Sequence, residues 1–215
     1  MLLRVFSYDI TPGRESDFGT FVRDHAIGRV RELPGVESAW FARRELDAGW
    51  QFVAVTCWRD YDSMVETVGR DLSRPIVAPT DADYEVSGSA QHFENIDEPA
   101  VGSGTEATVL RLLRGRTAPG RQEEVYSSIR NEGWPLLGQL PGIVDARIGR
   151  QGSSEGDVIL HVTVWRDRAS LEKATGGTLN RPLMPLPADS FSVESIDHFE
   201  IIQSATAIEI ETSAT

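Results

Sequence analysis

The sequence has one cysteine, no run of basic residues and no long apolar segment. Cys57 lies within an apolar stretch and has no second cysteine to pair with, so we expect a small core residue and no need for an oxidising compartment. No window approaches the roughly 18 apolar residues of a spanning helix, and the N-terminus lacks the pattern of a signal peptide. These absences predict a cytoplasmic protein.

Positive charge is scarce relative to negative charge. The formal net charge of -12 repels nucleic-acid phosphates and anionic lipid, so we expect neither a nucleic-acid nor a membrane partner. The 215 residues are 40% hydrophobic and 25% charged, which is ordinary for a globular protein with a core of normal size. This length suits either one or two domains.

An internal repeat is the most informative feature that is present. Three motifs recur at a constant offset of 107: Pro12-Gly13-Arg14 as Pro119-Gly120-Arg121, Leu33-Pro34-Gly35 as Leu140-Pro141-Gly142, and Trp58-Arg59-Asp60 as Trp165-Arg166-Asp167. A fourth, His92-Phe93-Glu94, returns as His198-Phe199-Glu200 at an offset of 106, so the second copy lacks one residue. The repeat predicts an N-terminal copy over 1–96, a linker over 97–106, a C-terminal copy over 107–203 and a tail over 204–215. The tail, with Ile208 and Ile210, is either an edge strand or disordered.

Each copy shows the same order of periodic segments. In the first copy, residues 3–10, 36–44, 51–58 and 85–96 have strand patterns, and residues 15–33 and 61–69 have helix patterns. This βαββαβ order is that of a ferredoxin-like α+β unit. Because one such sheet leaves an apolar face uncovered, we expect two tandem ferredoxin-like repeats to form an intramolecular pseudo-dimeric α+β barrel. The chain is then a monomeric pseudo-dimer or part of a homo-oligomer.

Both copies resemble the antibiotic biosynthesis monooxygenase family in two segments. One is the helix end at Leu33-Pro34-Gly35 or Leu140-Pro141-Gly142, and the other is the strand end at Trp58-Arg59-Asp60 or Trp165-Arg166-Asp167. The resemblance implies a dimeric α+β barrel that oxidises a small aromatic, polyketide-type substrate with dioxygen. It implies no cofactor, with reduced flavin and haem left open. Its haem-degrading branch uses an Asn on the first strand and a His on the second helix, and this sequence has neither.

Alternation along the third strand separates two faces. Val53, Val55 and Cys57 form an apolar face, as do Leu160, Val162 and Val164 in the second copy. The opposite face carries Thr56 and Trp58 in one copy, and His161, Thr163 and Trp165 in the other. In the family this mixed face lines the space between sheet and helices, so we predict that the threonines and tryptophans bind substrate there. Recurrence of both tryptophans also suits a packing role.

A titratable residue falls in the predicted buried stripe of each first helix, His25 in one copy and Glu132 in the other. Glu132 and His161 are expected to meet, and a carboxylate that orients an imidazole makes a general base able to deprotonate a phenol. The first copy has Ala54 in place of His161, so His25 would act alone. The alternatives are a structural role for both histidines and a solvent-facing Glu132.

The second copy has an irregular helix segment, and two further residues, an arginine and a histidine, recur in both copies. Gly133-Trp134-Pro135 predicts a kink that widens the cleft beside Glu132 and offers Trp134 as a stacking surface. Arg74 and Arg181 each precede a proline, and we expect a salt bridge that closes the loop there. His92 and His198 recur, which favours a structural role.

Two classes of function remain in view. The leading hypothesis is a cofactor-independent monooxygenase-like enzyme that oxidises a phenolic substrate, with His161, Glu132 and His25 as catalytic residues. The alternatives are a non-catalytic binding or structural barrel whose pockets are filled by side chains, and a cyclase or isomerase that uses the same base without oxygen.

Overall fold

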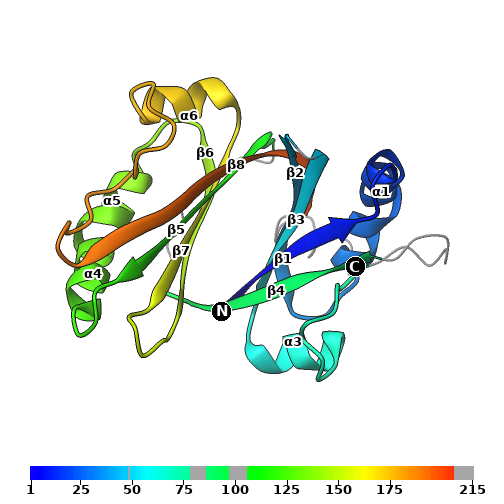
Figure 1. The fold of residues 1–215 in the computed structure, drawn as a ribbon, viewed down its shortest axis with the longest axis horizontal. Helices are drawn as coiled ribbons and strands as arrows, with labels where there is room; N and C mark the ends of the chain where they lie inside the picture. The colour runs from blue at the N-terminus through cyan, green and yellow to red at the C-terminus, as the bar shows by residue number, and fades with distance from the viewer. Residues whose placement is uncertain (48, 78–85, 97–105, 206–215) are drawn as a thin grey trace. The chain divides into compact units, whose positions relative to one another are not determined.

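We describe the chain from a computed structural model of residues 1–215, which places all residues except 48, 78–85, 97–105 and 206–215 well enough to describe (Figure 1). The first half contains β1 (Leu2–Ile10), α1 (Glu15–Phe21), η1 (Val22–Ala26), α2 (Ile27–Arg31), β2 (Val36–Leu46), β3 (Gly49–Trp58), α3 (Tyr61–Val68) and β4 (Val86–Asn95). The second half contains β5 (Val109–Thr117), α4 (Gln122–Ser128), η2 (Ile129–Gly133), α5 (Trp134–Leu137), β6 (Ile143–Gln151), β7 (Val158–Trp165), α6 (Arg168–Ala174) and β8 (Phe191–Ala205). Almost all of the predicted linker and tail lies outside the described residues.

The chain divides into two compact units. The first unit is Met1–His92 with Glu200–Thr215, and the second is Phe93–Phe199. Each unit thus holds most of one predicted copy and the end of the last strand of the other, and the boundaries assigned to the copies stay a prediction. In the part of the chain that is described, no helix is long and apolar enough to span a bilayer.

All strand pairs are antiparallel. In the first unit β3 lies between β1 and β2, and β2 also pairs with residues 200–205 of β8. In the second unit β7 lies between β5 and β6, and β6 also pairs with Glu94 and Asn95 of β4. The order of hydrogen-bonded neighbours is thus β1-β3-β2-β8 in the first unit and β5-β7-β6-β4 in the second. The chain is therefore an antiparallel α+β protein, as the periodicity predicts.

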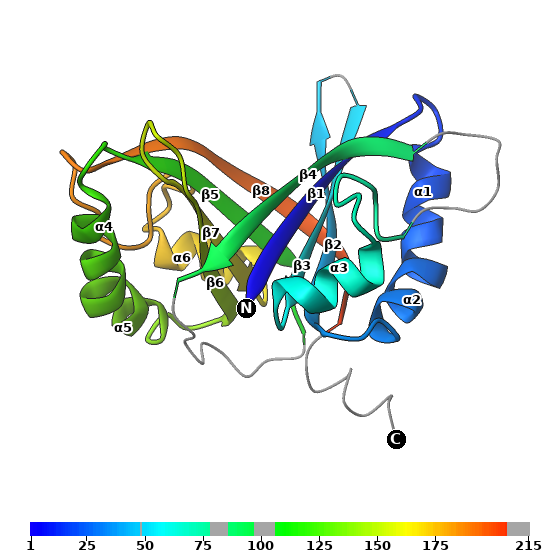
Figure 2. The ribbon, with the colours of Figure 1, turned by 90° about the horizontal axis from the view of Figure 1, so that it is seen from below.

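Helices cover one face of the sheet within each unit (Figure 2). We call the side chains between them the first layer and the second layer. The first layer includes Phe6, Phe18, Val22, Ala26, Val30, Phe52, Trp58 and Val77. The second layer includes Leu113, Val125, Ile129, Leu137, Ile159, Trp165 and Met184. The mixed face of the third strand thus meets the helices, as predicted, and the all-apolar face opposite is also buried.

A π-helical turn interrupts the long helix of each unit, as η1 and as η2. A π turn contains one residue more than an α turn, so it shifts the following residues by about 100° around the axis. The buried positions consequently run through Val22 and Ala26, or Ile129 and Gly133, at a spacing of four. The predicted stripe instead ran from Val22 to His25 and from Ile129 to Glu132, a spacing of three. It was wrong for His25 and Glu132, which are both exposed.

The irregularity at Gly133-Trp134-Pro135 includes a π turn, and the predicted kink stays a prediction. The first unit has the same π turn without a proline, so Pro135 is not its cause. Pro135 follows the π turn directly within the same continuous helix, and it has no N–H to donate to the preceding turn.

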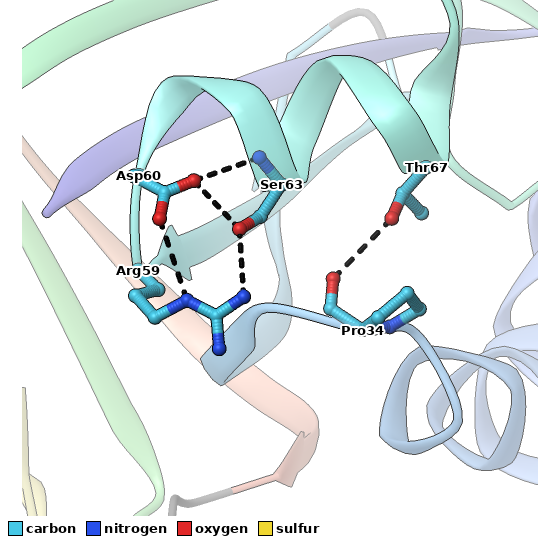
Figure 3. A network of polar contacts seen from close by, with 5 residues as sticks. All are labelled: Pro34, Arg59, Asp60, Ser63 and Thr67. Carbon is cyan, nitrogen blue, oxygen red and sulfur yellow. Dashed lines mark hydrogen bonds and ion pairs between the residues drawn. The ribbon is translucent and has the colours of Figure 1, made fainter.

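The recurring motifs are explained by a contact between a helix cap and a tight turn (Figure 3). Asp60 Oδ1 accepts hydrogen bonds from the backbone N–H of Ser63 at 2.7 Å and from its hydroxyl at 2.6 Å, which caps α3. A Cβ on Gly35, whose φ is +81°, would lie 2.3 Å from Ser63 Cβ. Gly35 O accepts from Arg59 N at 2.8 Å.

The second unit repeats this contact. Asp167 caps α6 through the backbone N–H of Ser170 at 2.7 Å, and Gly142 packs against Ser170. The hydrogen bonds to Ser170, followed by that from Arg166, lower the pKa of Asp167 to about 2. The segments that carry the family resemblance are therefore fold determinants, since each joins a helix cap to the turn before β2 or β6.

Candidate functional site

His161 is the central polar residue of the second layer. It lies on β7 opposite Leu113 of β5 and Ile148 of β6, and is 4% exposed. Its ring stacks on Phe191 with centroids 6.4 Å apart. Its Nε2 is buried and makes no hydrogen bond to any residue that the structure describes. Burial, and then the charge of Arg111, lower the pKa of His161 to about 3, so the imidazole is neutral and has a free nitrogen.

The predicted pairing of Glu132 with His161 does not form. Glu132 is exposed because of the π turn in η2, whereas His161 is buried. Trp134 is half-buried and packs into the second layer, and its Nε1 has no partner among the residues described. It therefore contributes to packing, and its role as a stacking surface stays a prediction.

Each unit contains a buried tryptophan–threonine pair at the end of its central strand. Trp58 Nε1 donates to Thr56 Oγ1 at 2.9 Å, and Trp165 Nε1 donates to Thr163 Oγ1 at 3.0 Å. Both indole rings are fully buried. The geometry gives these residues a packing role, and their contact with a substrate stays a prediction.

Two buried arginines were not among the predicted site residues. Arg4 and Arg111 are each 1% exposed and occupy equivalent positions on the first strand of their copies. Arg111 Nη2 donates to the backbone oxygen of Arg181 at 2.6 Å, and Arg4 Nη2 donates to that of Arg74. Burial lowers the pKa of both guanidinium groups to about 10. The signal in the sequence was an arginine repeated at the offset of 107 within an apolar strand.

In each unit, the loop that carries Arg74 or Arg181 is held by a hydrogen bond to its backbone, and not by the predicted salt bridge of that arginine's side chain. The carbonyls of Arg74 and Arg181 accept hydrogen bonds from the buried arginines, and among the described residues no salt bridge of the Arg74 or Arg181 side chain is found. His92 and His198 are half-buried, and each has an Nε2 without a hydrogen-bond partner in the described part of the chain. Burial, followed by the charge of the arginine in the same unit, lowers the pKa of both.

The two layers differ in how they are filled. An aromatic cluster occupies the first layer, with ring centroids 4.7 Å apart for Phe6 and Tyr8, 4.9 Å for Tyr8 and Phe18, and 5.0 Å for Phe18 and Phe52. At the offset of 107 the second unit has the smaller residues Leu113, Gly115, Val125 and Ile159. Phe191 takes the space over Gly115, where a Cβ would lie 2.1 Å from its ring. The second layer therefore combines smaller apolar side chains with the added imidazole of His161.

Between the two units, the π turn and the loop that covers it carry a small and a large side chain in different combinations. We therefore expect the stability effects of substitutions at the two positions to depend on each other. A Cβ on Gly133 would lie 2.7 Å from Met184 Sδ, whereas the equivalent pair in the first unit is Ala26 and Val77. We expect Gly133→Ala to be about 1 kcal/mol more favourable to stability in a Met184→Val background than in the parent. Urea denaturation of the four proteins measures this difference. Equal effects of Gly133→Ala in both backgrounds would contradict the coupling.

Metal binding has no evident centre in the described residues. They contain no group of three or more His, Cys, Asp or Glu side chains that could hold a metal ion.

Comparison with known proteins places the fold. No family model and no curated protein sequence matches the chain. A candidate monooxygenase from Fusobacterium nucleatum subsp. nucleatum ATCC 25586 matches with a TM-score of 0.65 and 12% identity, over 95% of this chain and 94% of that one. A candidate monooxygenase from Lactobacillus acidophilus NCFM has a TM-score of 0.57 and 11% identity, over 96% of each chain. An anthrone oxidase-like protein has a TM-score of 0.52 and 13% identity, over 96% of this chain and 93% of that one. At these identities the likeness establishes a shared α+β fold.

Proposed function

We propose that the chain is an oxidoreductase that oxidises a small phenolic or enolic aromatic compound with dioxygen, without a bound cofactor, in the second layer. The observation that carries the proposal is the neutral, buried imidazole of His161, whose Nε2 is free, in the unit whose aromatic filling is replaced by smaller side chains. The fold shared with candidate monooxygenases and an anthrone oxidase-like protein supports this reaction class.

The architecture that we propose for this enzyme is a tandem pair of ferredoxin-like copies acting as a pseudo-dimeric barrel. Support comes from the equivalent tryptophan–threonine pairs, helix caps and buried arginines of the two units. The copies differ in the side chains that fill the two layers. The first unit then serves as a scaffold, because its layer is filled by an aromatic cluster.

The proposed reaction begins with a proton transfer from the substrate to His161 Nε2. The resulting electron-rich anion gives one electron to dioxygen, and the radical and superoxide combine to form a carbon–oxygen bond. The peroxide then loses water, so a CH2 group becomes a carbonyl, with one dioxygen consumed and one water released. His161 supplies the base, and the apolar walls orient the ring and exclude water.

The basicity of His161 is low in this layer and depends on the charge beside it. Burial and the positive charge of Arg111 both disfavour the imidazolium ion. Negative charge that forms or binds beside Arg111 cancels the second effect and raises the proton affinity of the imidazole. Proton transfer is thereby coupled to the arrival of an anion, and no carboxylate partner such as Glu132 is needed.

Oxygen uptake by the purified protein tests the proposal. The protein is treated with chelator, freed of flavin and mixed with anthrone-type and other fused-ring phenolic substrates. We expect one dioxygen consumed for each quinone formed, with no increase when flavin or haem is added in separate arms. Conversion of the substrate without uptake would replace the oxidase with a cyclase or isomerase. Binding without conversion would make the chain a binding protein.

A further inference from the structure

We propose that Arg111 binds an organic anion, and that the second layer takes an aromatic carboxylate whose carboxyl group lies against Arg111. This inference deepens the proposed function, because it rests on the same layer and names the substrate class. It is tested by binding, which does not depend on turnover.

The argument starts from a comparison of the two buried arginines. Arg4 donates to the backbone oxygens of Leu72 and Arg74, and its guanidinium lies 5.1 Å from the centroid of the Phe6 ring. The Tyr8 hydroxyl adds a favourable interaction with its charge. Arg4 is therefore stabilised by two carbonyls, one aromatic face and one phenol.

Arg111 keeps only part of this environment. It donates to the backbone oxygen of Arg181, while Leu113 and Gly115 replace the ring and the phenol that serve Arg4. Burial alone accounts for the lowered pKa of Arg111, because no acidic residue that the structure describes opposes it. A buried cation without such compensation costs several kcal/mol.

The two histidines that sense the charge of Arg111 do not offset it. The charge of Arg111 disfavours protonation of both His161 and His198. Nε of Arg111 and Nε2 of both imidazoles are buried and have no hydrogen-bond partner within the described residues. Nε of Arg4 is unpartnered in the same sense, so the difference between the arginines lies in the second carbonyl, the Phe6 ring and Tyr8. A carboxylate neutralises the guanidinium, and its oxygens can accept from the Nε–H of Arg111.

One loop contacts this group of nitrogens. Residues 175–190 carry the Arg181 carbonyl that accepts from Arg111 and the Leu179 backbone that interacts with His198. The loop begins with Gly176 and Gly177, whose φ values of 62° and 81° favour glycine. An anion that replaces the Arg181 carbonyl at Arg111 would therefore enter by displacing this loop.

The test compares two probes of the same shape, 2-naphthoate and its neutral amide, 2-naphthamide. Titration calorimetry of the parent should show naphthoate binding about 10- to 100-fold more tightly, the range expected for a charged hydrogen bond. Arg111→Gln should abolish this preference. Arg4→Gln is the matched control and should retain it. A parent protein without preference would overturn the proposal, whatever the variants do.

Stability gives a second readout. Because Arg111 lacks the contacts that stabilise Arg4, Arg111→Leu should leave the urea midpoint unchanged or raised, whereas Arg4→Leu should lower it. Equal losses in both variants, together with equal binding of the two probes, would assign both arginines to loop closure. Tighter binding of ionised 2-naphthol than of naphthoate would overturn the choice of a carboxylate.

The outcome is separable from that of the oxidase proposal. A naphthoate preference without oxygen uptake by any substrate leaves the anion site standing and removes the oxidase. Turnover of neutral anthrones without a naphthoate preference keeps the oxidase and removes the anion site.

Discussion

His161→Ala is expected to reduce substrate-dependent oxygen uptake by about 10²- to 10⁴-fold, the usual loss when a general base is removed. His161 is the histidine of the central strand β7. Ala54, at the equivalent position in the first unit, cannot accept a proton. The loss should fall on kcat at pH values below the pKa of the substrate, because substrate that is already ionised needs no base. Steady-state oxygen-electrode measurements over pH report this directly.

Matched controls separate this role from damage to the layer. Added imidazole should restore part of the activity of His161→Ala, because the truncation leaves a space of that shape. His25→Ala and Glu132→Gln should retain parental rates, since both side chains are exposed. Equal uptake by the parent and His161→Ala would contradict the assignment, and a loss confined to His25→Ala would move the working site to the first unit.

Strand alternation was a sound guide to part of this site. A period of two requires residues 161, 163 and 165 to share one face of β7, whatever the neighbouring structure. The helix pattern was less secure, because one extra residue in a π turn rotates all that follows. The apolar spacing through Val22, Ala26 and Val30 contained this signal, since it remains at four where an α-helix would alternate between three and four. His25 and Glu132 were misplaced by that single residue.

Arg111 illustrates a limit of a different kind. A charged residue within an apolar strand is an exception to the burial pattern, and only its recurrence at Arg4 indicated a built environment. Its partner is a backbone carbonyl 70 residues away in an irregular loop, and no sequence pattern specifies such a contact. The absence of compensation around Arg111 depends in turn on which residues replace Phe6 and Tyr8, so it emerges only when the two units are compared.

Trp165→Ala and Trp58→Ala are each expected to lower the free energy of unfolding by about 3–5 kcal/mol, the range for truncating a buried tryptophan. Both rings are fully buried, and each indole N–H is satisfied by a threonine two residues earlier on the same strand. Truncation removes the ring contacts with the helices and leaves a hydroxyl that has lost its donor. Urea denaturation followed by circular dichroism measures both losses.

Trp50→Ala is the control, because this ring is 38% exposed and packs on the Arg43 guanidinium 4.6 Å from its centroid. It should cost less than about 1 kcal/mol. A large loss at both buried tryptophans assigns each of them to the packing of its own unit. If Trp165→Ala instead left stability intact and weakened naphthoate binding, while Trp58→Ala remained destabilising, the Trp165 ring would be a ligand contact. The predicted substrate-binding role would then hold for the second unit alone.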